Sequence, residues 1–494
     1  MKSNNSRLQM RFKSTNTFHP ILIALLVAIS SAPAHAAVWY ARAKGTGDGK
    51  AATSPIGSSA ALDAATKPGD VIILLPGEAS FDGGVALKPG QTLLGLAEGN
   101  RKPSITNTDT NRHDGNGVVL ANGSKVFDVR IEGTKASGVL GVDVSGAFLL
   151  GVDVQDANQS TNFTSATVNV LGRIPHGGIL FLATQSGKEV QNRVHECTVT
   201  IAAGIGIGAV ALSGGSNRLV VSHTSADKGG CVPPLFDMGI LALADGRSSE
   251  TQVELSDTSV GGRLSEQGRN VLAFASADAK ATARIERCTL RECGQDGVCA
   301  VAAMVPATVE VQIRNSTIER AGQMNIEGTI LNLPPSDPAR AHESLVSIDA
   351  LDCTIRDAGA VGPFRADAHN IWLAPTSFGP GPFAKGRYLL SVRNSTVTKA
   401  HRTGIEIGND GREFKIASDE GEYQVILRDN AITDNGSSEI AIAAAGALVD
   451  ARQNWWGTAT GLATNRVVLI DKAQWSQLDA SHPLLNQKDG RGSR

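Results

Sequence analysis

The sequence has few aromatic residues, no strong excess of either charge, and no apolar run of membrane-spanning length. Phe, Trp and Tyr make up 4% of the 494 residues, and 46 Lys and Arg stand against 48 Asp and Glu. This balance argues against a nucleic-acid-binding surface, which needs a concentrated positive field. The 54 glycines and the scarcity of aromatics suit a fold of short strands and tight turns. No transmembrane segment is expected in the mature chain.

The six cysteines do not have the spacing of a metal site. There is no Cys-x-x-Cys pair and no compact group of cysteine and histidine, so we predict no metal ligands. Three cysteines occupy the inward position of a repeat described below and are interpreted as buried thiols: Cys197, Cys288 and Cys353. The other three lie near turns, where one disulfide among them is the alternative to free thiols: Cys231, Cys293 and Cys299.

The first 36 residues have the features of a secretory signal peptide. Four basic residues and no acid precede or flank the apolar run 21–29, and Ala34-His35-Ala36 offers a cleavage site. We expect cleavage after Ala36 and export to the periplasm or the cell exterior; a buried N-terminal strand is the alternative. The remaining chain has 42 basic and 48 acidic residues, a net charge of about −6.

One eight-residue phrase repeats along the chain: apolar, x, apolar, x, x, small, x, apolar. Its small residue falls, in successive copies, at Cys197, Thr224, Thr258, Cys288, Ser316, Cys353, Ser395, Asn430 and Asn454. Neighbouring copies are 24 to 42 residues apart, and the two-residue alternation indicates strands rather than helices. We predict an all-β fold, a right-handed single-stranded parallel β-helix in which the small residues form an internal stack at a corner.

The repeat also defines the expected domain organisation. We assign a signal peptide to 1–36, the N-terminal start and cap to 37–100, the coils to 101–484, and a flexible tail to 485–494. A cap is expected because an open β-helix end exposes unpaired strand edges. Within it, 58–65 is predicted to be a short Ala-rich helix, and 71–75 the first buried strand.

A resemblance to a known family rests on four stretches, which are GTGDG (45–49), PGDVIILLPG (68–77), LKPGQTLLG (87–95) and QNWWGTATG (453–461). Together with the coils between them, this order resembles right-handed β-helix proteins of the pectate-lyase-like superfamily. The resemblance implies the β-helix fold. It does not imply one activity, because that superfamily includes lyases, glycoside hydrolases, epimerases, tailspikes and adhesins. Arg173-Ile174-Pro175-His176 keeps half of the pectate lyases' Arg-x-Pro-x-x-Arg, and Asn107-Thr108-Asp109 matches one polygalacturonase motif without the others. Neither activity can be transferred.

Three outward residues align on the second strands of neighbouring coils: Glu327, Trp372 and Glu406. Coils stack about 4.8 Å apart, so the two carboxylates should lie roughly 10 Å apart with the indole between them. We expect Trp372 to be exposed and to form a platform for a sugar ring. Two carboxylates near this separation approach the arrangement of an inverting glycosidase, in which one acts as acid and the other as base.

The turns before these strands supply the remaining candidates. The predicted catalytic residues are Glu327, Glu406, Asp367, His369 and His401, and the predicted substrate-binding residues are Trp372, Arg365, Arg402, Gln323 and Asn325. Carboxylates and imidazoles suit proton transfer, and guanidinium groups suit a uronate carboxylate. The loops 362–369 and 376–385 of this longest coil are expected to wall a groove. A second row of turn residues is a weaker candidate site and is interpreted as a row of salt bridges: Asp237, Glu266, Arg291 and Asp296.

Two functions remain open. The first is a secreted enzyme of the lyase or glycoside hydrolase type, acting on a polysaccharide through an outward groove around 320–410. The second is a noncatalytic glycan-binding, surface or adhesin-like β-helix, and a solvated structural face explains the same residues without any ligand. No cofactor is assigned. Calcium at Glu132 and Asp153, outward acids on successive coils, is the alternative to a salt-bridged surface there.

Overall fold

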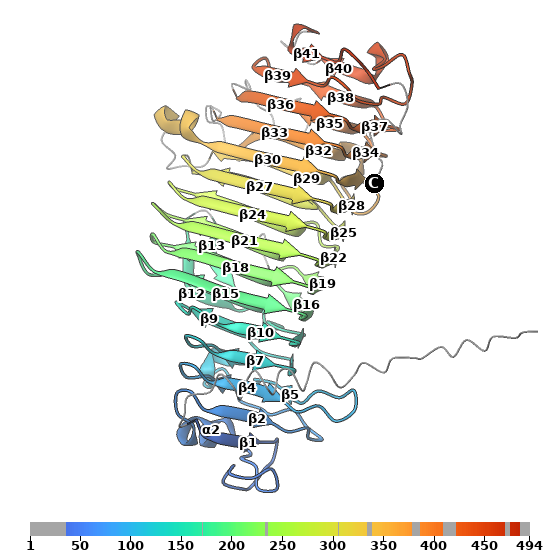
Figure 1. Ribbon diagram of the computed structural model, residues 1–494. Coiled ribbons are helices and arrows are strands. Elements are labelled where there is room, and N and C mark those ends of the chain that lie inside the picture. The colour runs from blue at the N-terminus through green and yellow to red at the C-terminus, as the bar shows by residue number, and fades with distance from the viewer. Residues whose placement is uncertain are drawn as a thin grey trace, which may run out of the picture.

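The chain winds into one continuous right-handed parallel β-helix, as predicted, in which successive coils add strands to three long sheets (Figure 1). The computed structural model describes residues 36–169, 171–232, 236–304, 306–332, 338–377, 386–408, 421–469 and 475–484. The predicted signal peptide up to residue 35, the tail 485–494 and most of the second groove loop, 378–385, lie outside these residues. Among the described residues, no helix has the length and apolar character to cross a membrane.

Sheet A contains 15 parallel strands within the described residues. In spatial order they are β1 (Val38–Ala41), β2 (Val71–Leu74), β4 (Thr92–Gly95), β7 (Lys125–Phe127), β10 (Phe148–Leu150), β15 (Glu189–His195), β18 (Ser216–Ser222), β21 (Glu250–Ser256), β24 (Lys280–Glu286), β27 (Thr308–Arg314), β30 (Leu345–Leu351), β33 (Arg387–Arg393), β36 (Glu422–Arg428), β39 (Ala447–Asp450) and β41 (Leu478–Asp479).

Sheets B and C complete each coil. The strands of sheet B are β5 (Ser104–Ile105), β8 (Arg130–Glu132), β11 (Asp153–Gln155), β16 (Thr198–Ala203), β19 (Ser225–Gly230), β22 (Ser259–Arg263), β25 (Thr289–Cys293), β28 (Thr317–Ala321), β31 (Thr354–Arg356), β34 (Thr396–Thr398) and β37 (Ala431–Thr433). The strands of sheet C are β3 (Val85–Ala86), β6 (Val118–Val119), β9 (Val139–Val142), β14 (Gly177–Ala183), β17 (Ile205–Leu212), β20 (Asp237–Asp245), β23 (Gly268–Ser276), β26 (Val298–Ala303), β29 (Met324–Asn332), β32 (His369–Ser377), β35 (Thr403–Ile407), β38 (Ser438–Ile442) and β40 (Val467–Leu469).

The other elements are short and lie outside the three sheets. An antiparallel hairpin, β12 (Phe163–Val168) and β13 (Gly172–Pro175), branches from the coil before β14. The helical segments are α2 (Ser59–Ala65), η1 (His113–Gly115), η2 (Pro338–Glu343), η3 (Arg365–Asp367), η4 (Thr464–Arg466) and η5 (Trp475–Gln477).

Apolar ladders fill the interior because alternate residues of every strand point inward. Val311 pairs in register with Ile348, Ile348 with Leu390, and Leu390 with Val425. All four are buried in one core cluster that runs from Ala41 to Trp456. Full burial of such a side chain contributes about 1.5–3 kcal/mol, so stability accumulates coil by coil.

The predicted stack of small residues forms the corner between sheets A and B. The backbone N–H of Cys353 donates to Ser395 Oγ (3.0 Å), that of Ser395 to Asn430 Oδ1 (2.9 Å), and that of Asn430 to Asn454 Oδ1 (2.9 Å). The residue before each stack position is left-handed, as at Asp352 with φ 57°. Cys197, Cys288 and Cys353 are buried free thiols as predicted, and the three turn cysteines are also free, so the alternative of a disulfide among them is not realised.

The N-terminal cap agrees with the sequence patterns. Helix α2 lies at the β1 end of the solenoid in Figure 1, and Ser58 caps it, because its Oγ accepts a hydrogen bond from Ala61 N (3.2 Å). Strand β2 is fully paired and mostly buried, as predicted, but β1 pairs ahead of it, with Val38 in register with Val71. At the opposite end, Trp456 belongs to the core cluster.

A second internal stack, made of asparagine amides, links sheet B to sheet C. Asn325 Nδ2 donates to Asn370 Oδ1 (2.7 Å), and Asn370 Nδ2 donates to Asn435 Oδ1 (3.0 Å). All three side chains are buried. Asn325 was predicted to bind substrate from a turn. The predicted position is wrong, because Asn325 lies in strand β29 and its buried amide donates a hydrogen bond to Asn370 inside the coil.

Replacing the central amide should destabilise the fold. Asn370→Ala removes one partner from each of Asn325 and Asn435, and a buried polar group without its partner costs about 1–3 kcal/mol. We expect a loss of this size in the free energy of unfolding measured by urea titration. Gln424→Ala, on the exposed side of β36, should change it by less than about 0.5 kcal/mol. Equal effects of the two variants would contradict a stabilising amide stack.

Candidate functional site

The candidate site lies on the side of sheet C that faces away from the core. Glu327 pairs in register with Trp372, and Trp372 with Glu406, as predicted. Their neighbours Ile371 and Ile405 belong to the core cluster, so the three alternate outward.

This outward face is nevertheless covered. The exposed fractions of Glu327, Trp372 and Glu406 are 9%, 3% and 1%. Trp372 packs with Met324 and Ala374 in an apolar cluster separate from the main core. The prediction of an exposed indole is therefore wrong. Strand alternation identifies the side of the sheet on which a residue lies, but not what packs over that side.

Four of the predicted residues form a group that we call the Glu406 cluster: Asp367, His369, Arg402 and Glu406. His369 Nδ1 lies 3.5 Å from Glu406 Oε2, and Arg402 Nη1 lies 3.5 Å from His369 Nε2. Arg402 also lies 3.5 Å from Asp367 Oδ1 and 3.9 Å from Glu406 Oε2. Because a guanidinium only donates, a neutral His369 imidazole would accept at Nε2 and carry its proton on Nδ1, the nitrogen nearest Glu406.

The Glu406 cluster extends from the surface into the protein. The side chain of Asp367, in η3, is 41% exposed, that of Arg402 is 9% exposed, and those of His369 and Glu406 are almost fully buried. Two carboxylates therefore flank one guanidinium, with an imidazole on the buried side. Such a group can orient, hold and transfer a proton.

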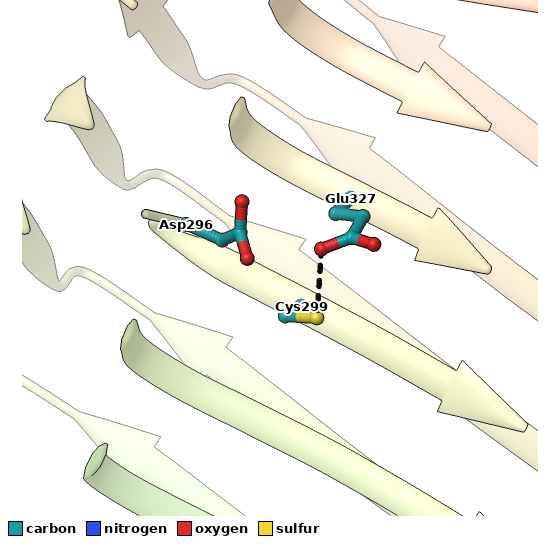
Figure 2. A group of neighbouring side chains, drawn as sticks. All are labelled: Asp296, Cys299 and Glu327. Carbon is teal, nitrogen blue, oxygen red and sulfur yellow. Dashed lines mark hydrogen bonds between the residues drawn. The ribbon is translucent and has the colours of Figure 1, made fainter. Parts of the chain in front are cut away.

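Glu327 belongs to a different group, the Glu327 cluster, with Arg269, Asp296 and Cys299. Cys299 Sγ donates to Glu327 Oε2 (3.0 Å), and Arg269 Nε donates to Asp296 Oδ2 (3.0 Å). Figure 2 shows the Asp296 carboxyl beside that of Glu327, with the Cys299 sulfur facing Glu327. One ligand atom of each of Asp296, Cys299 and Glu327 lies within 4.8 Å of the others.

Burial shapes the protonation of the Glu327 cluster. Burial, together with the neighbouring Glu327 carboxyl, raises the pKa of Asp296 well above its usual value. Burial likewise raises the pKa of the Cys299 thiol. Burial alone would lower the pKa of Arg269, but the Cys299, Asp296 and Glu327 groups around it hold that pKa above its usual value.

The remaining predicted residues lie at the rim or elsewhere. Arg365 and His401 are exposed at neighbouring turns, and Gln323 is half-buried, where its Oε1 accepts from Gln295 Nε2 (3.4 Å). In the second predicted row, Asp237 pairs with Arg263.

The outward acids proposed for calcium are paired with cations. Arg130 and Asp153 are in register as predicted, but Asp153 pairs with Lys102 (2.9 Å), and Arg130 pairs with Glu132 (3.0 Å). These ion pairs agree with the salt-bridged surface that was the alternative to calcium binding.

Sequence reasoning missed Arg269, Asp296 and Cys299 as parts of the site. Cys299 pairs in register with Glu327 one coil later, so extending the Glu327, Trp372, Glu406 alignment by one coil would have found it. Asp296 was named only as a member of the second row, and Arg269 gave no signal because it looks like an ordinary polar residue of a strand.

An open groove lies beside the hairpin β12–β13, farther along the same face of sheet C. It has a volume of about 810 Å³, and its lining includes Phe163, Arg173 and His176. The Arg173 guanidinium carbon lies 5.9 Å from the centre of the Phe163 ring. His176 is buried at the groove floor, where its Nδ1 lies 2.9 Å from Ser137 Oγ, and burial lowers its pKa to about 4. We call this the hairpin groove.

No protein-family model and no curated protein sequence matches the chain. Solved structures with a similar fold include a periplasmic alginate epimerase, AlgG, with 11% identity, 81% of this chain and 77% of that chain covered, and a TM-score of 0.41. The A-module of the Azotobacter vinelandii mannuronan C-5 epimerase AlgE6 has 13% identity, 87% and 93% coverage, and a TM-score of 0.38. Pectate lyase Pel9A has 12% identity, 93% and 80% coverage, and a TM-score of 0.26. The likeness concerns the β-helix fold alone, and similarity this low says nothing about the reaction of this chain.

Proposed function

We propose that this chain is an exported lyase acting on a uronate-containing polysaccharide, with the Glu406 cluster as its proton-transfer centre. The observation that carries the proposal is the graded burial of that cluster. An imidazole, a guanidinium and two carboxylates from neighbouring coils converge within 3.5 to 3.9 Å contacts, with Asp367 at the surface and Glu406 inside. Polar groups are rarely gathered in this way unless they are paired or used.

The residues suit β-elimination from a 4-linked uronate. Arg402 would bind the uronate carboxylate and acidify the proton on C5. Arg402 contacts the imidazole of His369, which is 1% exposed. When Arg402 turns to the uronate carboxylate, it would uncover Nε2 to accept that proton, and Glu406, 3.5 Å from Nδ1, would stabilise the imidazolium. The electron pair left on C5 forms the C4–C5 double bond, the C4–O bond breaks, and the leaving oxygen takes a proton from solvent.

Hydrolysis by the predicted carboxylate pair is less well supported. An inverting hydrolase needs room for a water and a sugar ring between its two acids. Between Glu327 and Glu406 the register instead holds Trp372, which is 3% exposed and packed against Met324 and Ala374. We therefore favour elimination over hydrolysis.

Noncatalytic glycan binding is the second candidate, and the hairpin groove favours it. That groove is open, and it presents an aromatic ring and a guanidinium, a pairing suited to sugar rings and acidic groups. In this case the Glu406 cluster would be a structural ion network.

The test is a panel of neutral and uronate polysaccharides, with ultraviolet absorbance reporting the unsaturated uronate and a reducing-end assay reporting hydrolysis. We expect unsaturated product from a uronate polymer. Glu406→Gln should lower the rate about 10²-fold, because it removes the charge that stabilises the imidazolium. Glu422→Gln, on the exposed side of β36, should leave the rate unchanged.

Other outcomes separate the alternatives. Reducing ends without unsaturation would mean hydrolysis and would overturn the lyase assignment. Binding without any product, abolished by Arg173→Ala, would establish the hairpin groove as a noncatalytic glycan site. Neither product nor binding across the panel would remove both candidates.

A further inference from the structure

The Glu327 cluster has the composition and the geometry of a metal site. The ligand atoms of Asp296, Cys299 and Glu327 lie within 4.8 Å of one another, and all three residues are buried. A sulfur and two carboxylate oxygens around one point are a ligand set for a divalent ion of the zinc type. The sequence excluded a cysteine-containing site for lack of close spacing, but the coil brings residues 28 positions apart into contact.

A second observation points into the same space. Among the described residues, no N–H or O–H group of another side chain or of the backbone donates to Asp296 Oδ1, although Asp296 is fully buried, and the Asp296 carboxyl lies against that of Glu327. Two facing carboxyls must share a proton or bind a cation between them. Leaving a buried acceptor without a partner costs about 1–3 kcal/mol, and buried carboxylates are normally paired or bound to a metal. Arg269 holds only the other oxygen, Oδ2 (3.0 Å), and so fixes the carboxylate with Oδ1 available.

We propose that Asp296 Oδ1, Cys299 Sγ and a Glu327 carboxylate oxygen bind one Zn²⁺-class ion, with Arg269 as the residue that positions Asp296.

The distances and charges fit this ion. Zinc lies about 2.3 Å from sulfur and about 2.0–2.2 Å from oxygen, so tetrahedral ligand atoms stand roughly 3.3–3.5 Å apart. The observed 3.0 Å between Cys299 Sγ and Glu327 Oε2 needs only a small opening to reach that value. With the thiol ionised, three negative ligands balance the ion and the Arg269 guanidinium. Calcium fits poorly, because it takes about six to eight oxygen ligands.

Three protein ligands leave a fourth position for water or another ligand, as in zinc sites with an open coordination position. The proposal does not depend on the proposed lyase activity, since it concerns the residues on the other side of Trp372 in the register. It is tested by spectroscopy, whether or not a polysaccharide is turned over.

The experiment uses the full chain, stripped with a chelator, dialysed and titrated with Co²⁺. We expect a thiolate-to-cobalt charge-transfer absorption that saturates at about one equivalent and disappears when Zn²⁺ is added. Cys299→Ala should abolish the absorption, and Asp296→Asn should weaken Co²⁺ binding at least about tenfold. Arg269→Gln should weaken it by about tenfold through the positioning of Asp296.

Cys231→Ala is the matched control, because Cys231 is the more exposed thiol and the obvious site for adventitious binding. It should leave the absorption unchanged. Absence of the band with several equivalents of Co²⁺, or an undiminished band in Cys299→Ala, would overturn the proposal. Circular dichroism checks that Cys299→Ala is folded; if it is not, Asp296→Asn decides, since an unchanged affinity in that variant would also overturn it.

Discussion

Arg263→Met should lower the free energy of unfolding by about 3–5 kcal/mol, because it leaves a buried carboxylate without its cation. Arg263, at the end of β22, and Asp237, at the start of β20, join sheet B to sheet C, with Arg263 Nη1 donating to Asp237 Oδ1 (3.1 Å). Both side chains are 0% exposed. Without the guanidinium, the Asp237 carboxylate would keep the Ser265 hydroxyl (2.6 Å) as its one side-chain donor among the described residues.

The surroundings of Arg263 show how closely its guanidinium is enclosed. A Cβ placed on Gly229 would lie 2.0 Å from Nη1, and one on Gly206 would lie 2.6 Å from Nη2. Positions 229 and 206 therefore require glycine, because any side chain there would collide with the guanidinium. Two of its nitrogens, Nε and Nη2, have no hydrogen-bond partner among the described residues, so the ion pair is incompletely satisfied.

Removing both charges should recover most of the loss. A buried ion pair that is not fully hydrogen-bonded is often replaced by neutral groups at little cost. We expect Asp237→Asn alone to be destabilising, and the double variant Arg263→Met, Asp237→Asn to be more stable than either single variant in a double-mutant cycle by urea unfolding. Arg284→Met, on an exposed position of β24, should change stability by less than about 0.5 kcal/mol. A loss below about 1 kcal/mol in Arg263→Met would show that the pair is dispensable.

The stability of the chain should fall as the pH drops from 6.5 to about 4 because of His176. Burial beneath the hairpin groove, opposed by the Asp114 charge and aided by the Arg173 charge, lowers the pKa of His176 from 6.5 to about 4. Between pH 6.5 and about 4, His176 is therefore protonated in the unfolded chain but remains neutral in the folded chain. The stabilisation is fully present above pH 6.5, and below about pH 4 no more is lost.

The difference between the pKa of His176 in the unfolded and folded chains corresponds to about 3 kcal/mol of the free energy of unfolding. About 2 kcal/mol of it is lost between roughly pH 7 and pH 5. Urea unfolding at those two values measures it. His176→Gln should remove this part of the pH dependence, whereas His401→Gln, at an exposed turn, should keep it. Parallel pH profiles for the parent chain and His176→Gln would mean that His176 titrates normally.

The two predictions concern residues that the sequence analysis treated in passing or not at all. Asp237 was placed in a row of salt bridges without its partner, because Arg263 lies 26 residues later, in a different sheet of the following coil. His176 was noted only as part of an incomplete motif. In both cases the decisive quantity is burial, which alternation along a single strand does not reveal.

The sequence by itself determined the β-helix, its register and the alignment of Glu327, Trp372 and Glu406, because one inward side of every strand must be apolar and equivalent residues must stack. It also determined the small-residue corner from Cys197 to Asn454. Only the tertiary structure decided that Trp372 is covered, that Asp367, His369, Arg402 and Glu406 meet, and that Asp296, Cys299 and Glu327 enclose a common point. Every inward residue packs in the same repeated environment, the core, so its pattern can be read from the sequence. The environment of each outward residue depends on turns and loops that do not repeat.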